Sequence, residues 1–540
     1  MQHSLRGECG RDGPLVALET TGPVGGRKAR GSRSIAGPRR AVRAVQRIPS
    51  RGGGGGNTHM SHFGKGVPER PQELPGGRRD PVEEAPSVWG LALYGFQHVL
   101  AFYAGAVVMP LLVAEGIGVT GEDIGILVNA SLLTCGIATI LQSVGLPGIG
   151  IRLPIVQGTS TTAVPSLVSV GLAAGGGKAG LPTVFGAVIA AGLALFVIAP
   201  VFSRLVRFFP PLVTGTILTI VGITLLAVAA RQVGGGNPAD ESFGTPAHLG
   251  MAAVTLAVIV LLHKFSRGFV ATVAVLAGLC VGTAVAALAG RADFSRIGDA
   301  AWVGVAAPLH YGTPRWDTMA VLFILLVMVI IAVESIGQFF AVGQIVDREV
   351  DGRQIVRALR ADGLATAMAG VLNSFPSTVY SQNVGLIRLT RVKSRWVVAS
   401  SGVIMLILGL VPKVGAAIAS MPASVLGGAT IVLFSTIAVV GVQILLQADL
   451  ADQRNTILVA ASVGIGFLPT AYPQFAERMP GRQLHALFES GIILGTLSAV
   501  LLNVFFHHVP LPRRRRNSSR PVDLSKDYMQ HDAEPGKSAS

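Results

Sequence analysis

Charged residues are scarce in this chain. Asp, Glu, Lys and Arg make up 14% of its 540 residues, whereas hydrophobic residues make up 50%. A soluble protein of this length could not bury so much apolar surface in one core. Apolar runs long enough to cross a bilayer recur from about residue 88 to residue 506, and no sizeable soluble domain fits between them. The composition therefore excludes a soluble fold and predicts an all-α polytopic protein of the lipid bilayer.

Cysteine is nearly absent as well. Cys9, Cys135 and Cys280 are isolated, so they form neither a disulfide framework nor a set of metal ligands. The zinc-binding HExxH and nucleophile-elbow GxSxG patterns do not occur in a suitable context, and the glycines before Lys178 fail the phosphate-loop pattern. We therefore expect no metal site, no cofactor and no enzymatic activity.

Basic residues outnumber acidic ones, and the formal net charge is +15. Such an excess can indicate a nucleic-acid partner, but here it lies in the termini and in short loops, without aromatic residues between the charges. Loop arginines set membrane orientation instead. Four arginines at 513–516 follow the last apolar run. With an even number of spans, they place both termini in the cytoplasm of a cell-membrane protein that has no nucleic-acid partner.

The two ends of the chain differ from its apolar middle. Residues 1–86 are rich in Arg, Gly and Pro, and residues 507–540 are polar, so we predict that both segments are disordered. No apolar h-region follows the early arginines, which argues against a secretory signal and leaves a transit peptide as a weaker alternative. Five glycines at 52–56 stand just before Met60, as a translated ribosome-binding site would. We hypothesise that synthesis starts at Met60.

Fourteen candidate spans can be counted, in two groups of seven. The first group occupies residues 88–290, with spans near 88–113, 122–144, 153–170, 181–200, 211–229, 247–263 and 269–289. The second occupies residues 317–506, with spans near 317–345, 355–371, 382–390, 396–411, 422–445, 455–469 and 484–506. An odd-numbered unit leaves the chain on the opposite side of the membrane. The two groups are therefore predicted to be inverted repeats, which are typical of transporters.

Two of these spans are short and interrupted, at corresponding positions of the two groups. They lie at residues 151–170 and 371–390, and each passes from proline and β-branched residues through a polar pair into a short apolar helix. Backbone broken at membrane depth is tolerated only where protein or a wet cavity satisfies it. One such segment is often only a kink. A matched pair predicts two half-helices whose N-termini face a ligand cavity.

Polar side chains occur inside the apolar runs. Glu334 lies in the run near 317–345, where contact with lipid would be costly, and Gln338 shares its helical face. His98 and Asp362 are the other polar residues of this kind. A lone membrane histidine often only joins two helices, and Asp362 is near enough to a predicted span start to be an N-cap. We predict a function for Glu334 and leave both interpretations open for His98 and Asp362.

The second interrupted span contains a recognisable pattern, QNVGLIRLTR. Gln382, Asn383, Gly385 and Thr390 complete the order Gln or Glu, Asn, any residue, Gly, four residues, Thr. This resembles the signature of the nucleobase–ascorbate transporter family, also called the xanthine/uracil permeases. Polar residues elsewhere resemble family positions in the expected order, namely Gln97, His98, Gln157, Gly158, Thr159, Ser160, Glu334 and Asp362. The resemblance extends over about residues 88–506.

The resemblance implies a detailed architecture. It implies fourteen spans in two inverted repeats, with a core domain of spans 1 to 4 and 8 to 11 and a gate domain of spans 5 to 7 and 12 to 14. Short β-strands would precede the half-helices of spans 3 and 10, and the substrate would lie between those half-helices. The core would move against the gate, often within a homodimer.

The resemblance also implies roles for single residues. Glu334 would bind the base and take part in proton coupling, and Gln382 would bind the polar edge of the base. Asn383 would hold the signature segment, while His98 and Asp362 would support the core network. The other residues expected at the substrate are Asn383, Gln157, Thr159, Ser160 and Gln338. Many relatives carry Asp or His at the position of Gln338, so the detail of coupling stays open.

The first residue of the signature bears on the substrate. Family members for uracil resemble the pattern with Glu, whereas Gln-Asn is typical of xanthine and urate carriers. The Gln382 amide offers both a donor and an acceptor, which suits an oxidised purine. We therefore expect proton-coupled uptake of xanthine or urate. The alternatives are uptake of uracil or another nucleobase, a channel or receptor, and an anion carrier of the sulfate-permease type, against which the Glu334 carboxylate argues.

Overall fold

The computed structural model describes residues 80–205, 209–480, 484, 487–488 and 490–509. The predicted disorder of the two ends, the proposed start at Met60 and the arginines at 513–516 lie largely or wholly outside these residues. Residues 80–86, which close the predicted N-terminal extension, form a turn that leads toward the first helix, with Val82 fully buried.

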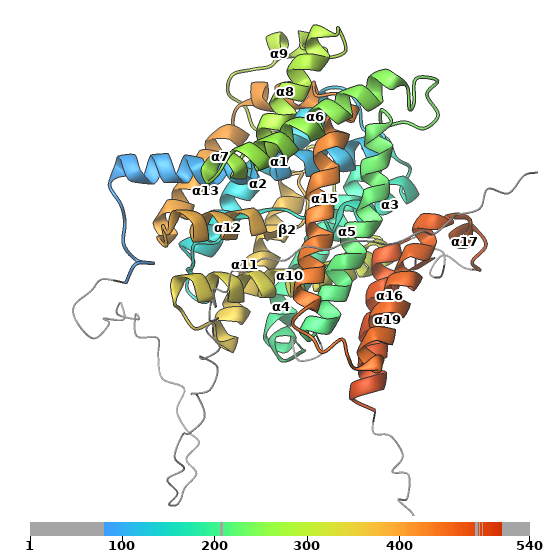
Figure 1. The fold of residues 1–540 in the computed structure, drawn as a ribbon. Coiled ribbons are helices and arrows are strands. Elements are labelled where there is room, and N and C mark those ends of the chain that lie inside the picture. Colours follow the sequence, from blue (N-terminus) through green and yellow to red (C-terminus); the bar gives the residue numbers. More distant parts are fainter. Residues whose placement is uncertain (1–79, 206–208, 481–483, 485–486, 489, 510–540) are drawn as a thin grey trace, which may run out of the picture. The chain divides into compact units, whose positions relative to one another are not determined.

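Helices dominate the first part of the described chain, interrupted by one short strand (Figure 1). The first apolar run begins where the Ser87 hydroxyl accepts a hydrogen bond from the Gly90 amide, and it ends at Gly118, which has a φ of 87°. The elements are α1 (Val88–Ile117), α2 (Glu122–Ser143), β1 (Gln157–Thr159), α3 (Val164–Ala173), α4 (Gly177–Leu205), α5 (Pro211–Val233), α6 (Pro246–Phe265), α7 (Phe269–Thr272), α8 (Ala274–Leu288) and α9 (Ser295–Asp299).

The second part has a similar order of elements. Asp317 caps the first long helix by accepting from the Ala320 amide, and Asp351 forms a capping box with Gln354 at the start of the next. The elements are α10 (Thr318–Val346), α11 (Gly352–Val371), β2 (Ser377–Val379), α12 (Ser381–Thr390), α13 (Arg395–Gly409), α14 (Pro412–Ala419), α15 (Ala423–Leu445), α16 (Gln453–Ala471), α17 (Gln474–Glu477) and α19 (Gly491–His507).

Several of these helices can cross a membrane. Among the described residues, seven helices are long and apolar enough to do so, namely α1, α2, α4, α5, α6, α10 and α15. The bent pair α13 and α14, with an angle of 79° between its helices, raises the number to eight if it counts as one span. The prediction of a helical multi-pass protein is confirmed, while the full number of fourteen spans stays a prediction.

Helices from the two parts of the chain pack against each other directly. Helix α5 lies along α15, α4 along α11, and α2 along α13. Glycines allow the close approach in the α4–α11 pair, because a Cβ added at Gly192 would lie 2.5 Å from the Ala367 nitrogen and one at Gly363 would lie 2.6 Å from the Phe196 nitrogen. Small residues at such crossings let helix backbones touch, as is common in membrane proteins. The two parts of the chain therefore share one interior.

The two interrupted segments meet in that interior. Strand β1 pairs antiparallel with β2, in the register Gln157 to Val379 and Thr159 to Ser377, and all six strand residues are buried. Gly158 lies under the ring of Tyr380, since an added Cβ there would overlap Tyr380 Cε2. Each strand is followed by a ten-residue helix, α3 or α12. The antiparallel pairing thus joins two short helices, one from each part of the chain, which begin at opposite ends of the strand pair.

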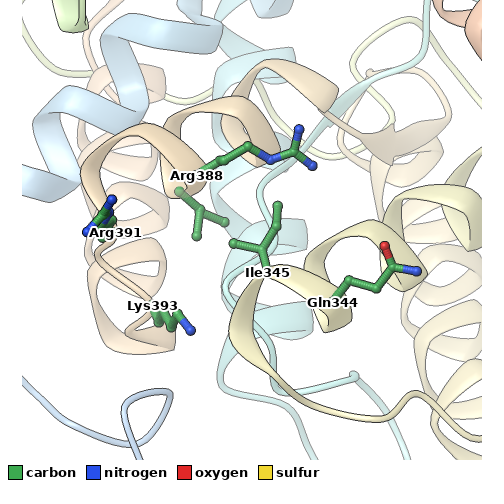
Figure 2. Close-up of a pocket in the computed structure, with 6 residues that line it drawn as sticks. Gln344, Ile345, Arg388, Arg391 and Lys393 are labelled. Carbon is green, nitrogen blue, oxygen red and sulfur yellow. The ribbon is translucent and has the colours of Figure 1, made fainter. Parts of the chain in front are cut away.

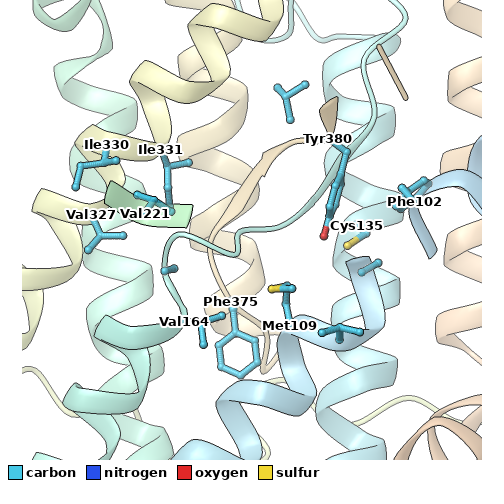
Figure 3. Packing of buried hydrophobic residues seen from close by; sticks show 14 of the residues in the cluster. Phe102, Met109, Cys135, Val164, Val221, Val327, Ile330, Ile331, Phe375 and Tyr380 are labelled. Atoms are coloured by element: carbon cyan, nitrogen blue, oxygen red, sulfur yellow. The ribbon is translucent and has the colours of Figure 1, made fainter. Parts of the chain in front are cut away.

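Apolar side chains surround the strand pair. Figure 3 shows Tyr380 near Cys135 and Phe102, with Phe375 and Met109 below them. The rings of Phe102 and Tyr380 have centroids 5.5 Å apart. The Tyr380 hydroxyl donates a hydrogen bond of 2.9 Å to the Thr159 carbonyl, so it fastens α12 to the first strand. This packing fixes the start of α12, which contains the signature residues and is called the signature helix below.

Candidate functional site

Within the described residues, the starts of α3 and α12 have no side-chain caps, although the Val164 amide of α3 is bonded to the Thr161 carbonyl and Pro165 has no N–H group. In the described structure neither helix receives a hydrogen bond from a capping side chain, because α3 has Ala163 at its N-cap and α12 has Tyr380. The first N–H groups of an uncapped helix carry positive partial charge and need acceptors. The two helix starts can therefore bind an anion or the carbonyl groups of a ligand.

Glu334 faces the first of these two segments. The Thr162 hydroxyl, which lies between β1 and α3 and is fully buried, donates a hydrogen bond of 3.1 Å to Glu334 Oε2. Glu334 itself is only partly buried, on a helix whose neighbouring Ser335 is fully buried. Sequence reasoning had not singled out Thr162. Its only local signal is its place in the hydroxyl-rich run at 159–162 that follows the polar pair of the interrupted segment.

Gln382 stands in the first turn of the second short helix. Its Oε1 atom is buried and has no hydrogen-bond partner among the described residues, although the residue as a whole is partly accessible. Helix α12 packs against α10, the helix of Glu334. Gln338 is partly accessible one turn after Glu334 on that helix. A buried amide oxygen without a partner is costly, so it is a suitable place for a ligand donor.

Asn383 ties the signature helix to α1. Its Nδ2 atom donates 2.9 Å to His98 Nδ1 and 3.2 Å to the His98 carbonyl, and both side chains are buried. Gly385 is exposed, with open space where a Cβ would lie. The Thr390 hydroxyl donates to the Leu386 carbonyl at 2.9 Å at the far end of the helix. Within the signature, Asn383 therefore holds the helix against α1 and Thr390 bonds within the helix, while Gln382 and Gly385 leave room beside it.

Asp362 lies at the centre of a buried polar network. Its Oδ1 atom accepts from Gln142 Nε2 at 2.6 Å and from Gln157 Nε2 at 2.7 Å. The N-cap interpretation of Asp362 is wrong, because α11 begins ten residues earlier and Asp351 provides its cap. Gln142 had not been predicted, since an amide inside an apolar helix gives no local sign of a partner far along the chain. Gln157 uses its amide nitrogen in this network, and its Oε1 atom is buried without a partner in the described structure.

The other two residues expected near the substrate lie in the strand region. Thr159 Oγ1 is 2.8 Å from Ser131 Oγ, which is in turn 3.1 Å from Ser374 Oγ, so Thr159 belongs to a chain of hydroxyls. The Ser160 amide donates to the Pro376 carbonyl at 2.8 Å and prolongs the strand pairing. The Ser160 hydroxyl is buried and lacks a partner among the described atoms. Ser160 is thus the member of this pair with free hydrogen-bonding capacity.

Comparison with known proteins decides the family. Residues 90–475 match a family model described as Permease family, Xan_ur_permease. The chain belongs to the nucleobase–ascorbate transporter family. This membership confirms the resemblance seen in the signature and identifies the chain as a transporter rather than an enzyme. The matched residues include the strand pair, both short helices and most of the other helices in both parts of the chain.

The matches to similar curated proteins cover 76–80% of this transporter and 90–93% of each relative. The uric acid transporter UacT of Escherichia coli (strain K12) is 40% identical over 438 residues, which are 80% of this chain and 90% of that protein. The xanthine permease of Bacillus subtilis (strain 168) is 38% identical over 413 residues, 76% of this chain and 93% of the relative. The uric acid permease PucJ of the same organism is 37% identical over 414 residues, 76% and 91% of the two chains.

Solved structures with low sequence identity share the fold of this transporter. The transmembrane domain of a cyanobacterium bicarbonate transporter, BicA, matches with a TM-score of 0.50 at 16% identity, covering 78% of this chain and 99% of that one. Murine Slc26a9, an anion transporter in the inward-facing state, matches with a TM-score of 0.52 at 14% identity, covering 79% and 69% of the two chains. These likenesses concern the fold alone.

Proposed function

We propose that this transporter carries an oxidised purine base, urate or xanthine, into the cell by alternating access. The observation that supports this most directly is the pairing of two interrupted segments through β1 and β2. Glu334 lies next to this pair and is hydrogen-bonded to Thr162. Gln382 lies at the start of the second short helix, and its buried amide oxygen has no hydrogen-bond donor among the described residues. The similar proteins named as uric acid and xanthine carriers support the choice of substrate.

The proposed roles follow from these contacts. The Glu334 carboxylate accepts an N–H of the base, and the Gln382 amide pairs with a neighbouring carbonyl and N–H edge. Ser160 and the uncapped starts of α3 and α12 face the remaining carbonyl groups. Asn383 with His98, and Asp362 with Gln142, hold the two short helices in place and do not touch the base. Gln157, Thr159 and Gln338 complete the surroundings of the base.

Coupling to protons is assigned to Glu334. Protonation of this carboxylate and binding of the base favour the same state of the carrier, so a proton gradient drives accumulation. Protons are then the coupling ion, and no cofactor is needed. Glu334 suits this role because Thr162 bonds it to the first interrupted segment, its helix α10 packs against the second, and it remains partly accessible.

The finer architecture belongs to the same proposal. Residues 88–290 and 317–506 form two inverted repeats of seven spans each, and α1 to α4 with α10 to α13 form a core that moves against a gate of the remaining spans. The cross-packing of α2 with α13 and of α4 with α11 supports this, since spans 2 and 9 are equivalent, as are spans 4 and 11. Both termini are cytoplasmic, and two copies form a homodimer.

Uptake of radiolabelled urate by a bacterial strain without its own purine permeases tests the function. Expression should give saturable uptake that a protonophore abolishes and that unlabelled xanthine competes with more strongly than uracil does. Saturable uptake separates a carrier from a channel or a receptor. Uptake of labelled uracil without uptake of labelled urate or xanthine would replace the purine proposal by the uracil alternative.

A second candidate is an anion carrier of the sulfate-permease type. It is favoured by the fold shared with the bicarbonate transporter BicA and with Slc26a9. The Glu334 carboxylate beside the first interrupted segment opposes it, because a fixed negative charge repels a small inorganic anion that has no N–H group to donate to it, as a purine base has. Inhibition of urate uptake by millimolar sulfate or bicarbonate, together with uptake of labelled sulfate, would favour this candidate over purine uptake.

A further inference from the structure

A basic cavity lies at the far ends of the two helices that carry the candidate site. Its volume is about 440 Å³, within the roughly 300–1,000 Å³ of small-molecule sites, and its lining is Gln344, Ile345, Ile387, Arg388, Arg391 and Lys393. Figure 2 shows Arg391 and Lys393 on one side of the cavity, Ile345 and Gln344 on the other, and Arg388 extending across the cavity toward the side of Gln344. The cavity therefore lies between α10 and α12, just beyond the signature.

On α10, one accessible face connects the candidate site with this cavity. Glu334, Gln338, Ala341 and Ile345 are partly accessible and follow one another at intervals of four, three and four residues, which is the spacing of a single helical face. Most of the residues between them are buried. With a rise of about 1.5 Å per residue, this face runs some 16 Å from Glu334 to Ile345.

On α12, a second accessible face runs the same way. Gln382 is partly accessible, and Gly385 and Arg388 are exposed at successive intervals of three residues, whereas Asn383 and Leu386 are buried. The missing side chain of Gly385 leaves open space between Gln382 and Arg388. Glutamate, glutamine and arginine side chains on these two faces are unsuited to contact with lipid. The two faces are suited instead to a hydrated path between the candidate site and the cavity.

The cavity has an excess of positive charge. Lys393 Nζ is paired with Asp347 Oδ2 at 2.5 Å, and Asp347 is largely exposed. Within the described part of the chain, the ion pairs include no carboxylate partner for Arg388 or Arg391. Both arginines are exposed and can reach a solute in the cavity. Two guanidinium groups without a carboxylate partner favour an anion in the cavity. Because a guanidinium group is planar, it also stacks well on a planar anion.

We propose that this cavity is a second, transient binding subsite for anionic purines on the transport path, in which Arg388 and Arg391 bind the negative charge. The inference rests on the proposed function. Urate is an anion at neutral pH, and the Glu334 carboxylate on its path repels it. A basic mouth at the end of the same two helices offsets this repulsion by raising the local concentration of the anion. An uncharged base has less need of the subsite.

Transport kinetics in proteoliposomes test the subsite. The double variant Arg388→Gln with Arg391→Gln should raise the KM for urate about five- to tenfold while Vmax stays within about twofold. All measurements are made at a mildly acidic pH, at which xanthine is uncharged and urate is an anion. At this pH the KM for xanthine should change less than about twofold. Arg388→Lys with Arg391→Lys should restore most of the urate affinity. Arg353→Gln, which removes an exposed arginine at the start of α11, is the matched control and should behave as wild type.

The comparison of urate with xanthine separates the anion subsite from an effect that does not depend on charge. The comparison of two lipid compositions separates it from a lipid site. An equal rise of the KM for urate and for xanthine in the double variant would overturn the proposal, because the charge of the substrate would then not matter. A loss seen only in liposomes that contain phosphatidylglycerol, and not in pure phosphatidylcholine, would assign the cavity to a lipid headgroup instead. Size-exclusion profiles and thermal unfolding of each purified variant show whether it is folded. Absence of urate and xanthine uptake by the wild-type protein would refute the proposed function itself.

Discussion

Replacing Gln142 by leucine should destabilise the fold, because this one side chain joins three parts of the interior. Its Nε2 atom donates to Asp362 Oδ1 at 2.6 Å and to the Ala358 carbonyl at 2.9 Å, both on α11. Its Oε1 atom accepts from the Ile151 amide at 3.1 Å, just before the first strand. Gln142 is 1% exposed, so water cannot take over these bonds. Leucine has a similar size and removes all three.

The size of the effect follows from these bonds. An intramolecular hydrogen bond contributes about 1 kcal/mol net, and a buried group left without its partner costs about 1–3 kcal/mol. In the variant, Asp362 Oδ1 keeps the bond from Gln157, whereas the Ile151 amide loses its side-chain acceptor. We therefore expect the free energy of unfolding to fall by about 3 kcal/mol.

Unfolding of the purified protein in mixed micelles, with increasing SDS, measures this change. Gln443→Leu on α15 is the matched control, since Gln443 is exposed and the substitution should change stability by less than about 0.5 kcal/mol. A double-mutant cycle with Asp362→Asn should give a coupling of about 1–2 kcal/mol. Additive effects in the cycle, or a Gln142→Leu protein as stable as wild type, would refute the network.

Three further substitutions test the site directly. Thr162→Val keeps the shape and removes the hydroxyl that donates to Glu334, so urate uptake should fall about tenfold, while Thr162→Ser should retain most of it; equal loss in both variants would exclude the hydrogen bond as the cause. Gly158→Ala places a Cβ inside the space of the Tyr380 ring, so the yield of folded protein on size exclusion should drop several-fold, and a normal yield would contradict this packing. Gln382→Glu removes a donor, so competition by xanthine against labelled urate should weaken about tenfold, and unchanged competition would exclude Gln382 from recognition.

Much of the helical framework could be predicted from hydropathy. The long apolar runs became α1, α2, α4, α5, α6, α10 and α15, with ends within a few residues of the predicted ones. Helix α14 was missed, because only eight residues follow the break at Pro412 and they fall between two predicted spans. The chain bends there by 79° instead of entering a loop. A short helix of this kind has too few residues to show a period.

The site was only partly predictable, for a physical reason. Glu334 and Gln382 stand out because a carboxylate in an apolar run and a polar pair in a broken span are each visible within a few residues. Gln142 and Thr162 do not stand out, since each takes its meaning from a partner more than a hundred residues away. The pairing of β1 with β2 likewise joins residues more than two hundred positions apart, so no local pattern shows it. Local patterns identified the broken segments, and only the fold showed which groups meet there.

Accumulation of urate in proteoliposomes under an imposed pH gradient tests the central claim, that Glu334 couples purine transport to protons. The wild-type protein should concentrate labelled urate against its gradient and lose this ability when a protonophore is added. Glu334→Gln should abolish the accumulation, whereas Glu349→Gln, which removes an exposed carboxylate after α10, should leave it unchanged. Accumulation by the Glu334→Gln protein at the wild-type level would contradict the account.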